Sequence, residues 1–153
     1  MAVKAQPEQY HTITPYLYVR GGAKALDYYK AAFGAVEIFR MAMPDGRIGH
    51  CEFKIGDSIV MMADEFPEGD VVGPQTLGNS SVGITLYIPD VDAVTNQAVS
   101  LGATIIKPLA NQFYGDRTAT LRDPFGHKWT IATHVEDVTP EEMERRMAAM
   151  SKK

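Results

Sequence analysis

Apolar and polar residues alternate along several short stretches of the chain, which is the pattern of strands with one buried face. The first stretch is TITPYLYV at residues 12–19, where Pro15 lacks an N–H and favours an edge position. Residues 23–33 instead carry apolar side chains at helical spacing, and Gly34 follows them as a common helix terminus. The chain is therefore expected to begin with a strand followed by a helix.

A second strand is predicted over residues 35–43, AVEIFRMAM. The segment RIGHCEFKIGDSIVMMADE, residues 47–65, then predicts two strands joined at Gly56 and Asp57, which suit a tight hairpin turn with positive φ. If that turn holds two residues, Glu52 pairs with Met61, and the two side chains share a face. The first half of the chain thus has the order β-α-β-β-β.

The pattern begins again after residues 66–79, which are rich in glycine, proline and polar residues and are interpreted as a linker or mobile loop. A strand is predicted over residues 81–88, and a helix capped by Asp90 or Asp92 is predicted to run to about Leu101. Three strand-like stretches complete a second β-α-β-β-β order: ATIIKPL, DRTATLR and KWTIATH.

The two halves can be aligned at one constant offset. The first strands set Thr14 opposite Gly83, and the last strands set Met61 opposite Thr130, an offset of 69 residues in both cases. Two independent strand alignments that share one offset are unlikely by chance. We therefore expect an α+β fold made of two tandem modules that form a curved sheet around a cavity.

A C-terminal helix is predicted after the second module, with Thr139 as its N-cap and Pro140 at its first position. Met143, Met147 and Met150 form an apolar stripe on this helix, which packs either on its own domain or on a second subunit. The expected organisation is an N-terminal extension, a first module, a linker, a second module and a helical tail, at residues 1–11, 12–65, 66–79, 80–135 and 136–153.

Composition narrows the possible partners. The 153 residues carry a net charge of −4, so a basic surface for nucleic acid or for an acidic membrane is not expected. The sequence shows neither a secretory segment nor a membrane-spanning run, and we expect a cytoplasmic protein. The single cysteine, Cys51, excludes an internal disulfide and is interpreted as a small buried hydrophobe.

The duplicated order resembles that of the vicinal oxygen chelate superfamily. Three segments share the resemblance: PYLYVRGGAKALDYYKAAFGA, GHCEFKIGDSIVMMADE and YGDRTATLRDPFGHKW. This superfamily includes glyoxalase I, extradiol dioxygenases and bleomycin-resistance proteins, and the chain is most similar to its PhnB-like members. The resemblance covers residues 12–134. It implies a cavity enclosed by two modules or two subunits, and a homodimer.

The resemblance also implies four metal positions, one on the first and one on the last strand of each module. Here they are Thr14, Met61, Gly83 and Thr130, and none of these is a plausible ligand for a divalent transition metal. We therefore expect no cofactor, and we do not expect metal-dependent glyoxalase or dioxygenase activity. The alternative is a divalent metal at a relocated site.

The residues predicted to line the cavity combine apolar surface with hydroxyl groups and aromatic rings, which suits a small organic ligand. Some of them would instead fill the interior. The candidate ligand-binding residues are Thr14, Tyr16, Tyr18, Met61, Thr85, Tyr87, Tyr114, Arg117 and Thr130.

His50 and Glu52 share a face of their predicted strand beside Met61. A histidine two residues from a carboxylate can act as a general acid/base pair, because the carboxylate holds the ring and its tautomer. The pair could also be an inert rim contact, or half of a relocated metal site completed by Asp64, His134 or another chain. We take His50 and Glu52 as the candidate catalytic residues.

The orientation of the strand DRTATLR is open. Depending on the length of the following loop, either Asp116, Thr118 and Thr120 or Arg117, Ala119 and Leu121 face the cavity. Arg117 could clamp a carboxylate or phosphonate there, or it could pair with an acidic residue at the surface. Trp129 is expected to point away from the cavity, into the layer between sheet and helix.

Two functions follow as hypotheses. The first is a metal-independent protein that binds a small organic molecule in the cavity. The second is an isomerase, lyase or transferase that acts on a small organic substrate through His50 and Glu52 or a relocated metal. A structural or regulatory dimer with a closed cavity is a third, weaker hypothesis.

Overall fold

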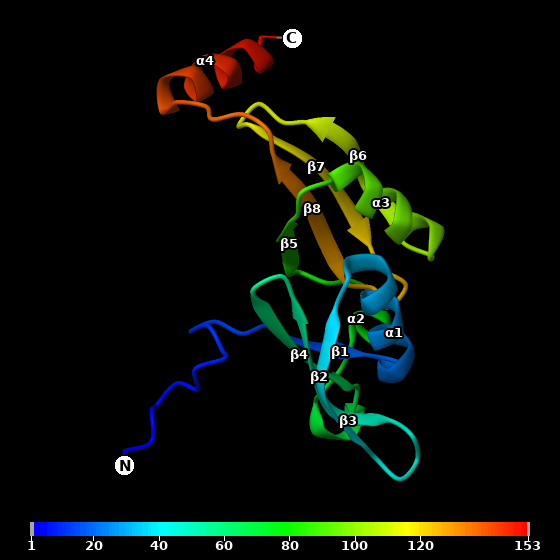
Figure 1. The fold of residues 1–153 in the computed structure, drawn as a ribbon. Helices are drawn as coiled ribbons and strands as arrows, with labels where there is room; N and C mark the ends of the chain where they lie inside the picture. Colours follow the sequence, from blue (N-terminus) through cyan, green and yellow to red (C-terminus); the bar gives the residue numbers. More distant parts are fainter. Residues whose placement is uncertain (1, 153) are drawn as a thin grey trace. The chain divides into compact units, whose positions relative to one another are not determined.

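The computed structural model describes residues 2–152, so Met1 of the predicted N-terminal extension and Lys153 of the predicted tail lie outside the described residues. The chain divides into two compact units (Figure 1). The first comprises residues up to Ser81 together with Pro124–His127. The second comprises Val82–Asp123 and the residues from Lys128 onward.

The first unit contains a four-stranded mixed sheet in the order β1-β4-β3-β2, in which only β1 runs parallel to its neighbour. Helix α1 packs against β2, β3 and β4. A 3-10 helix, η1, and a short helix, α2, follow the sheet. The bounds are β1 (Tyr16–Val19), α1 (Gly22–Phe33), β2 (Val36–Ala42), β3 (Ile48–Ile55), β4 (Ser58–Asp64), η1 (Pro67–Gly69) and α2 (Pro74–Leu77).

The core of this unit lies between α1 and the sheet. Leu26 and Tyr29 of α1 are fully buried, and the Tyr29 ring stacks on Phe53 of β3 with centroids 5.4 Å apart. Cys51 is also buried on this side of β3, where burial raises the pKa of its thiol to about 11. The cysteine is therefore the small buried hydrophobe that the sequence predicts, because its thiol stays protonated at neutral pH.

The second unit repeats the same architecture, with a mixed sheet in the order β5-β8-β7-β6 and helix α3 packed against β6, β7 and β8. Trp129 is buried between sheet and helix, as expected, and its indole N–H donates to Asp123 at 2.9 Å. The bounds are β5 (Gly83–Tyr87), α3 (Val91–Ser100), β6 (Thr104–Asn111), β7 (Asp116–Arg122), β8 (Lys128–His134) and α4 (Pro140–Met150).

The strand registers confirm the duplication. Tyr16 pairs with Met61 between β1 and β4, and Thr85 pairs with Thr130 between β5 and β8. Tyr16 and Thr85 are 69 residues apart, and so are Met61 and Thr130, which is the offset found in the sequence. The predicted α+β fold of two β-α-β-β-β modules is therefore confirmed, with each module forming its own four-stranded mixed sheet.

Local predictions hold at several helix and turn positions. The turn at Gly56 and Asp57 sets Glu52 opposite Met61, as expected for a two-residue loop. Of the two proposed caps for α3, Asp90 is the one whose side chain accepts from a backbone N–H in the first turn. Thr139 caps α4 by accepting from the backbone N–H of Glu142.

Two local predictions need correction. The first strand begins at Tyr16, not at residue 12, and the Thr14 hydroxyl donates to the His11 carbonyl at 3.1 Å. The segment 66–79 is not a plain linker, because it forms η1 and α2 and belongs to the first unit. Gly73 places its α-carbon against the Tyr18 carbonyl, where a Cβ would lie 2.9 Å from the oxygen, so the segment lies directly on β1.

Helix α4 is held by polar contacts. Arg146 donates to Glu136, to Glu142 and to the Phe113 carbonyl. The rest of the chain does not cover the methionines at the end of this helix, because Met147 is 54% and Met150 58% exposed. Contact with a second subunit stays a prediction. Within residues 2–152, no helix is long and apolar enough to cross a membrane.

Candidate functional site

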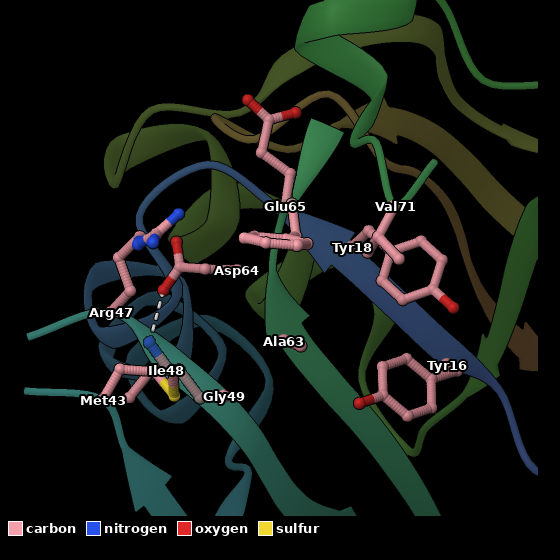
Figure 2. A pocket seen from close by; sticks show the side chains of 11 residues that line it. Tyr16, Tyr18, Met43, Arg47, Ile48, Gly49, Ala63, Asp64, Glu65 and Val71 are labelled. Carbon is pink, nitrogen blue, oxygen red and sulfur yellow. Dashed lines mark hydrogen bonds between the residues drawn. The ribbon is translucent and has the colours of Figure 1, made fainter. Parts of the chain in front are cut away.

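The first unit contains a cavity of about 440 Å³ beside β1 and β4 (Figure 2). The rings of Tyr16 and Tyr18 lie on one side, with centroids 5.2 Å apart, and Met43 and Arg47 lie on the other. Most of the remaining lining is apolar and comes from Ile48, Ala63, Phe66 and Val71. The cavity therefore offers an apolar and aromatic surface to a ligand.

Two carboxylates border the cavity, and both have internal partners. Asp64 accepts the backbone N–H groups of Gly21 and Gly22 at the start of α1 and that of Ile48 at 2.6 Å, the contact drawn in Figure 2. Glu65 accepts from Arg20, from Thr76 and from the Gly73 N–H. These carboxylates thus hold the helix and the loop against the sheet.

Arg47 supplies the positive charge at the opposite side of the cavity. Its Nε donates to Asp45 at 2.8 Å, and its guanidinium carbon lies 5.9 Å from the centroid of the Phe66 ring. The contact with Phe66 is of the cation–π type. The side chain is half exposed, which leaves the planar donor edge of the guanidinium accessible to an anionic or carbonyl group.

A chain of hydrogen bonds leads from the cavity wall across the sheet. The Tyr16 hydroxyl lies 2.8 Å from Nδ1 of His50, and Nε2 of His50 lies 3.0 Å from Oε2 of Glu52. The second oxygen of Glu52 accepts from the hydroxyl of Tyr10. The predicted pair of His50 and Glu52 is thus formed, and it is joined at both ends to a tyrosine.

The ionisation of Glu52 fixes the direction of these bonds. Burial opposes its charge, but the hydrogen bonds from Tyr10 and His50 together outweigh burial and hold the pKa of the carboxyl below its ordinary value. Burial, followed by the nearby acidic groups, raises the pKa of the Tyr16 phenol. Glu52 is therefore an acceptor, and Tyr16 keeps its proton.

The second unit carries a different polar chain. The Tyr87 hydroxyl donates to the buried Asp116 at 2.6 Å, and the other oxygen of Asp116 lies 2.7 Å from Nδ1 of His134. Nε2 of His134 lies 2.7 Å from Asp137. The hydrogen bonds to Asp137 and Asp116 raise the pKa of His134, since both favour the imidazolium form.

The register of β7 and β8 resolves the open orientation of DRTATLR. Thr120 pairs with Thr130, so Asp116, Thr118 and Thr120 share a face with Thr130. Arg117 lies on the other face, where Nε and Nη2 donate to Asp92 of α3 at 2.7 and 3.1 Å. The loop at residues 123–127 thus settles the parity that the sequence leaves open, with Arg117 paired to an acidic residue, and ligand binding by Arg117 stays a prediction.

The other candidate ligand-binding residues occupy separate places. Met61 lies between Tyr16 and Glu52 in the first sheet. Thr130 shares a hydrogen bond with Thr120 at 3.1 Å, and Thr85 beside it is exposed. Tyr114 is 39% exposed and meets the Phe113 ring edge-on. Binding by these residues stays a prediction.

Neither the family metal positions nor the alternative site at His50 and Glu52 is suited to bind a metal ion. The four family positions hold no strong ligand, and Thr14 lies before the start of β1. A relocated site at His50 and Glu52 would need a third donor, but Asp64 is already bound to three backbone N–H groups. Across residues 2–152, no three His, Cys, Asp or Glu side chains are grouped so that they could hold a metal ion.

The sequence interpretation missed two parts of the site. Met43, Arg47 and Phe66 line the cavity from the β2–β3 turn and from the segment interpreted as a linker, where no periodic pattern marks a binding residue. Tyr10 lies in the predicted N-terminal extension, 42 residues from its partner Glu52. No local signal reveals such long-range contacts.

This fold and site can be compared with known proteins. A model of the Glyoxalase/Bleomycin resistance protein/Dioxygenase superfamily matches residues 9–131, and the chain belongs to this superfamily. An uncharacterized protein from Mycobacterium bovis is 36% identical over 152 residues, which cover 97% of each chain. A protein of Mycobacterium tuberculosis, also uncharacterized, is 36% identical over 97% of this chain and 87% of its own length.

Solved structures share the fold at lower identity. TioX from Micromonospora sp. ML1 has a TM-score of 0.62 and 24% identity, covering 84% of this chain and all of TioX. The PhnB protein from Bacillus cereus has a TM-score of 0.65 and 17% identity, covering 80% and 99%. The fosfomycin resistance protein FosX from Listeria monocytogenes has a TM-score of 0.62 and 19% identity, covering 87% and 97%.

Proposed function

We propose that this protein binds a small organic molecule in the cavity of its first module, without the metal of its superfamily. The observation that carries the proposal is the cavity itself, a space of about 440 Å³ lined by two tyrosines, a phenylalanine and aliphatic side chains. Ligand sites in proteins are mostly apolar spaces of about 300–1,000 Å³ with a few placed polar groups.

The polar groups indicate the kind of molecule. Asp64 and Glu65 are occupied by internal hydrogen bonds, whereas Arg47 and Tyr16 each retain hydrogen-bonding capacity toward the cavity. An aromatic or otherwise flat apolar body would contact the rings of Tyr16 and Tyr18. A polar or anionic group at its far end would meet Arg47, which lies opposite these rings (Figure 2).

A thermal-shift screen of small aromatic and aliphatic acids, amides and phenols, followed by calorimetry, tests this proposal. Binding should be lost in Ala63→Leu, because the larger side chain fills the cavity from β4. Ala148→Leu is the matched control, since Ala148 is exposed on α4 and does not line the cavity. A ligand that binds both variants as tightly as the unsubstituted protein would contradict the proposed site.

A second candidate function is acid/base catalysis on the bound molecule. The specific observation in its favour is that Tyr16, which lines the cavity, contacts His50, and that His50 in turn contacts Glu52. A carboxylate that fixes a histidine tautomer leaves the other ring nitrogen unprotonated, so that it can take a proton through the Tyr16 hydroxyl bound to it. Loss of turnover in both His50→Ala and Glu52→Ala would support an enzyme, and unchanged turnover would contradict this role.

A further inference from the structure

Tyr16 links the cavity to the polar chain behind it. Its ring lines the cavity, and the residue is 39% exposed, so a ligand in the cavity can reach the phenol. The same hydroxyl lies 2.8 Å from Nδ1 of His50. The rings of Tyr16 and His50 also lie in contact, tilted against each other with centroids 5.4 Å apart.

The hydrogen atoms along this chain can be assigned. Glu52 accepts from Tyr10 through one oxygen and lies 3.0 Å from Nε2 of His50 through the other. An ionised carboxylate has no hydrogen to give, so Nε2 carries the proton of the neutral imidazole and Nδ1 is bare. Tyr16 therefore donates its only hydrogen to Nδ1. Its oxygen can then only accept a hydrogen bond from a ligand.

We propose that the cavity selects molecules carrying a weakly acidic hydroxyl group, of the phenol or enol class, and that Tyr16 relays the proton of that hydroxyl to His50. This inference rests on the proposed function, since it requires a ligand in the cavity of the first module. A ligand without a donor at this position would leave the Tyr16 oxygen unpaired on binding, which lowers its affinity.

The proton transfer balances without another reactant. The ligand O–H bond breaks as a new O–H bond forms on Tyr16, and the original Tyr16 O–H bond breaks as an N–H bond forms at Nδ1 of His50. The ligand becomes an oxyanion and His50 becomes an imidazolium. Glu52 stabilises the imidazolium through Nε2, because a carboxylate in a hydrogen bond with a cation strengthens that bond.

Two probes that differ only by a methyl group on one oxygen separate this proposal from simple binding. 4-Nitrophenol carries the required hydroxyl, and its ionised form is identified by its visible absorption. 4-Nitroanisole has a methoxy group in its place and cannot donate. We expect the unsubstituted protein to bind 4-nitrophenol more tightly than 4-nitroanisole, and to ionise the bound phenol at a pH where the free phenol is mostly protonated.

Two variants separate the hydrogen bond from the proton transfer. Tyr16→Phe removes the acceptor and should weaken 4-nitrophenol binding about fivefold, the effect of one neutral hydrogen bond, without weakening 4-nitroanisole binding. His50→Asn keeps an acceptor for the Tyr16 hydroxyl but has no basic nitrogen. This variant should bind 4-nitrophenol and fail to ionise it. Tyr28→Phe, in the core outside the cavity, is the matched control and should behave as the unsubstituted protein does.

The outcomes distinguish this inference from the proposed function. Equal affinity for both probes, with the absorption of bound 4-nitrophenol unchanged, would overturn the Tyr16 relay and leave the cavity as a ligand site. Ionisation that persists in His50→Asn would also overturn the relay, because another group would then take the proton. Absence of binding by both probes would count against the cavity itself and against the inference that rests on it.

Discussion

Nε2 of His50 lies 3.0 Å from Oε2 of Glu52 on the same face of β3, and this contact places the single proton of the neutral imidazole. The tyrosine hydroxyl on the other side of the ring then meets a bare nitrogen. A two-residue separation along a strand is sufficient for this arrangement, because alternate side chains of a strand point to the same side.

The first prediction concerns this tautomer. Neutral His50 should carry its proton on Nε2, and Glu52→Ala should give a mixture of both tautomers because the fixing acceptor is gone. The ¹⁵N chemical shifts of the ring nitrogens report the tautomer directly. The exposed His11 serves as the internal reference and should not respond to Glu52→Ala. Protonation of neutral His50 at Nδ1 in the unsubstituted protein would contradict the assigned direction of the Tyr16 hydrogen bond.

The second prediction concerns the pH dependence of stability. The pKa of His134 is raised by Asp137 and Asp116. Protonated His134 therefore adds to the free energy of unfolding below its unfolded pKa of about 6.5, and this contribution is lost as pH rises through the folded pKa. Burial opposes ionisation of Asp116, but hydrogen bonds from Tyr87 and His134 lower its pKa. Ionised Asp116 therefore adds to the free energy of unfolding above its unfolded pKa of about 4, and this contribution is lost as pH falls through the folded pKa.

His134→Gln should consequently reduce the free energy of unfolding more at about pH 5.5 than at about pH 8.5. Urea denaturation at the two pH values measures this difference. In an Asp116→Asn background the pH dependence of the effect should shrink, since one of the two partner carboxylates is neutral. An effect of His134→Gln that grows toward alkaline pH would show that the sign is wrong.

The third prediction concerns the approach of the tail to the second sheet. Gly115 has a φ of 105°, and a Cβ there would lie 2.1 Å from the Glu136 carbonyl oxygen. Gly115→Ala should destabilise the protein by about 1–3 kcal/mol, because it combines an unfavourable φ with a backbone clash. Gly83→Ala is the matched control, since nothing lies within 4 Å of a Cβ at that position. Equal stability of the two variants in urea denaturation would contradict this account.

The fourth prediction concerns the hydrogen bond between the buried Trp129 and Asp123. Trp129→Phe should cost about 1–3 kcal/mol, because it removes buried surface and leaves a carboxylate oxygen without that donor. A double-mutant cycle with Asp123→Ala isolates the pair, and a coupling of about 1 kcal/mol is expected. Circular dichroism is the appropriate probe, since Trp129 is the only tryptophan. Strict additivity of the two substitutions would contradict a stabilising bond.

Local patterns were sufficient for most of the fold. Alternation placed the strands, the glycines marked the end of α1 and the turn at Gly56, and Thr139 marked the start of α4, because these signals act over a few neighbouring residues. The pairing of His50 with Glu52 followed for the same reason. The start of β1 was misplaced, since alternation over residues 12–15 does not reveal whether a strand has a partner there.

The sequence by itself determined the duplicated α+β fold and the face shared by His50 and Glu52, because periodicity and a constant offset of 69 residues carry this information. The superfamily followed from the resemblance of its motifs. Only the tertiary structure decided that Tyr16 and Tyr10 complete the polar chain, that Arg47 and Phe66 border the cavity, and that Arg117 turns to Asp92. These contacts depend on loop lengths and on packing between distant segments, and neither is expressed in a local pattern.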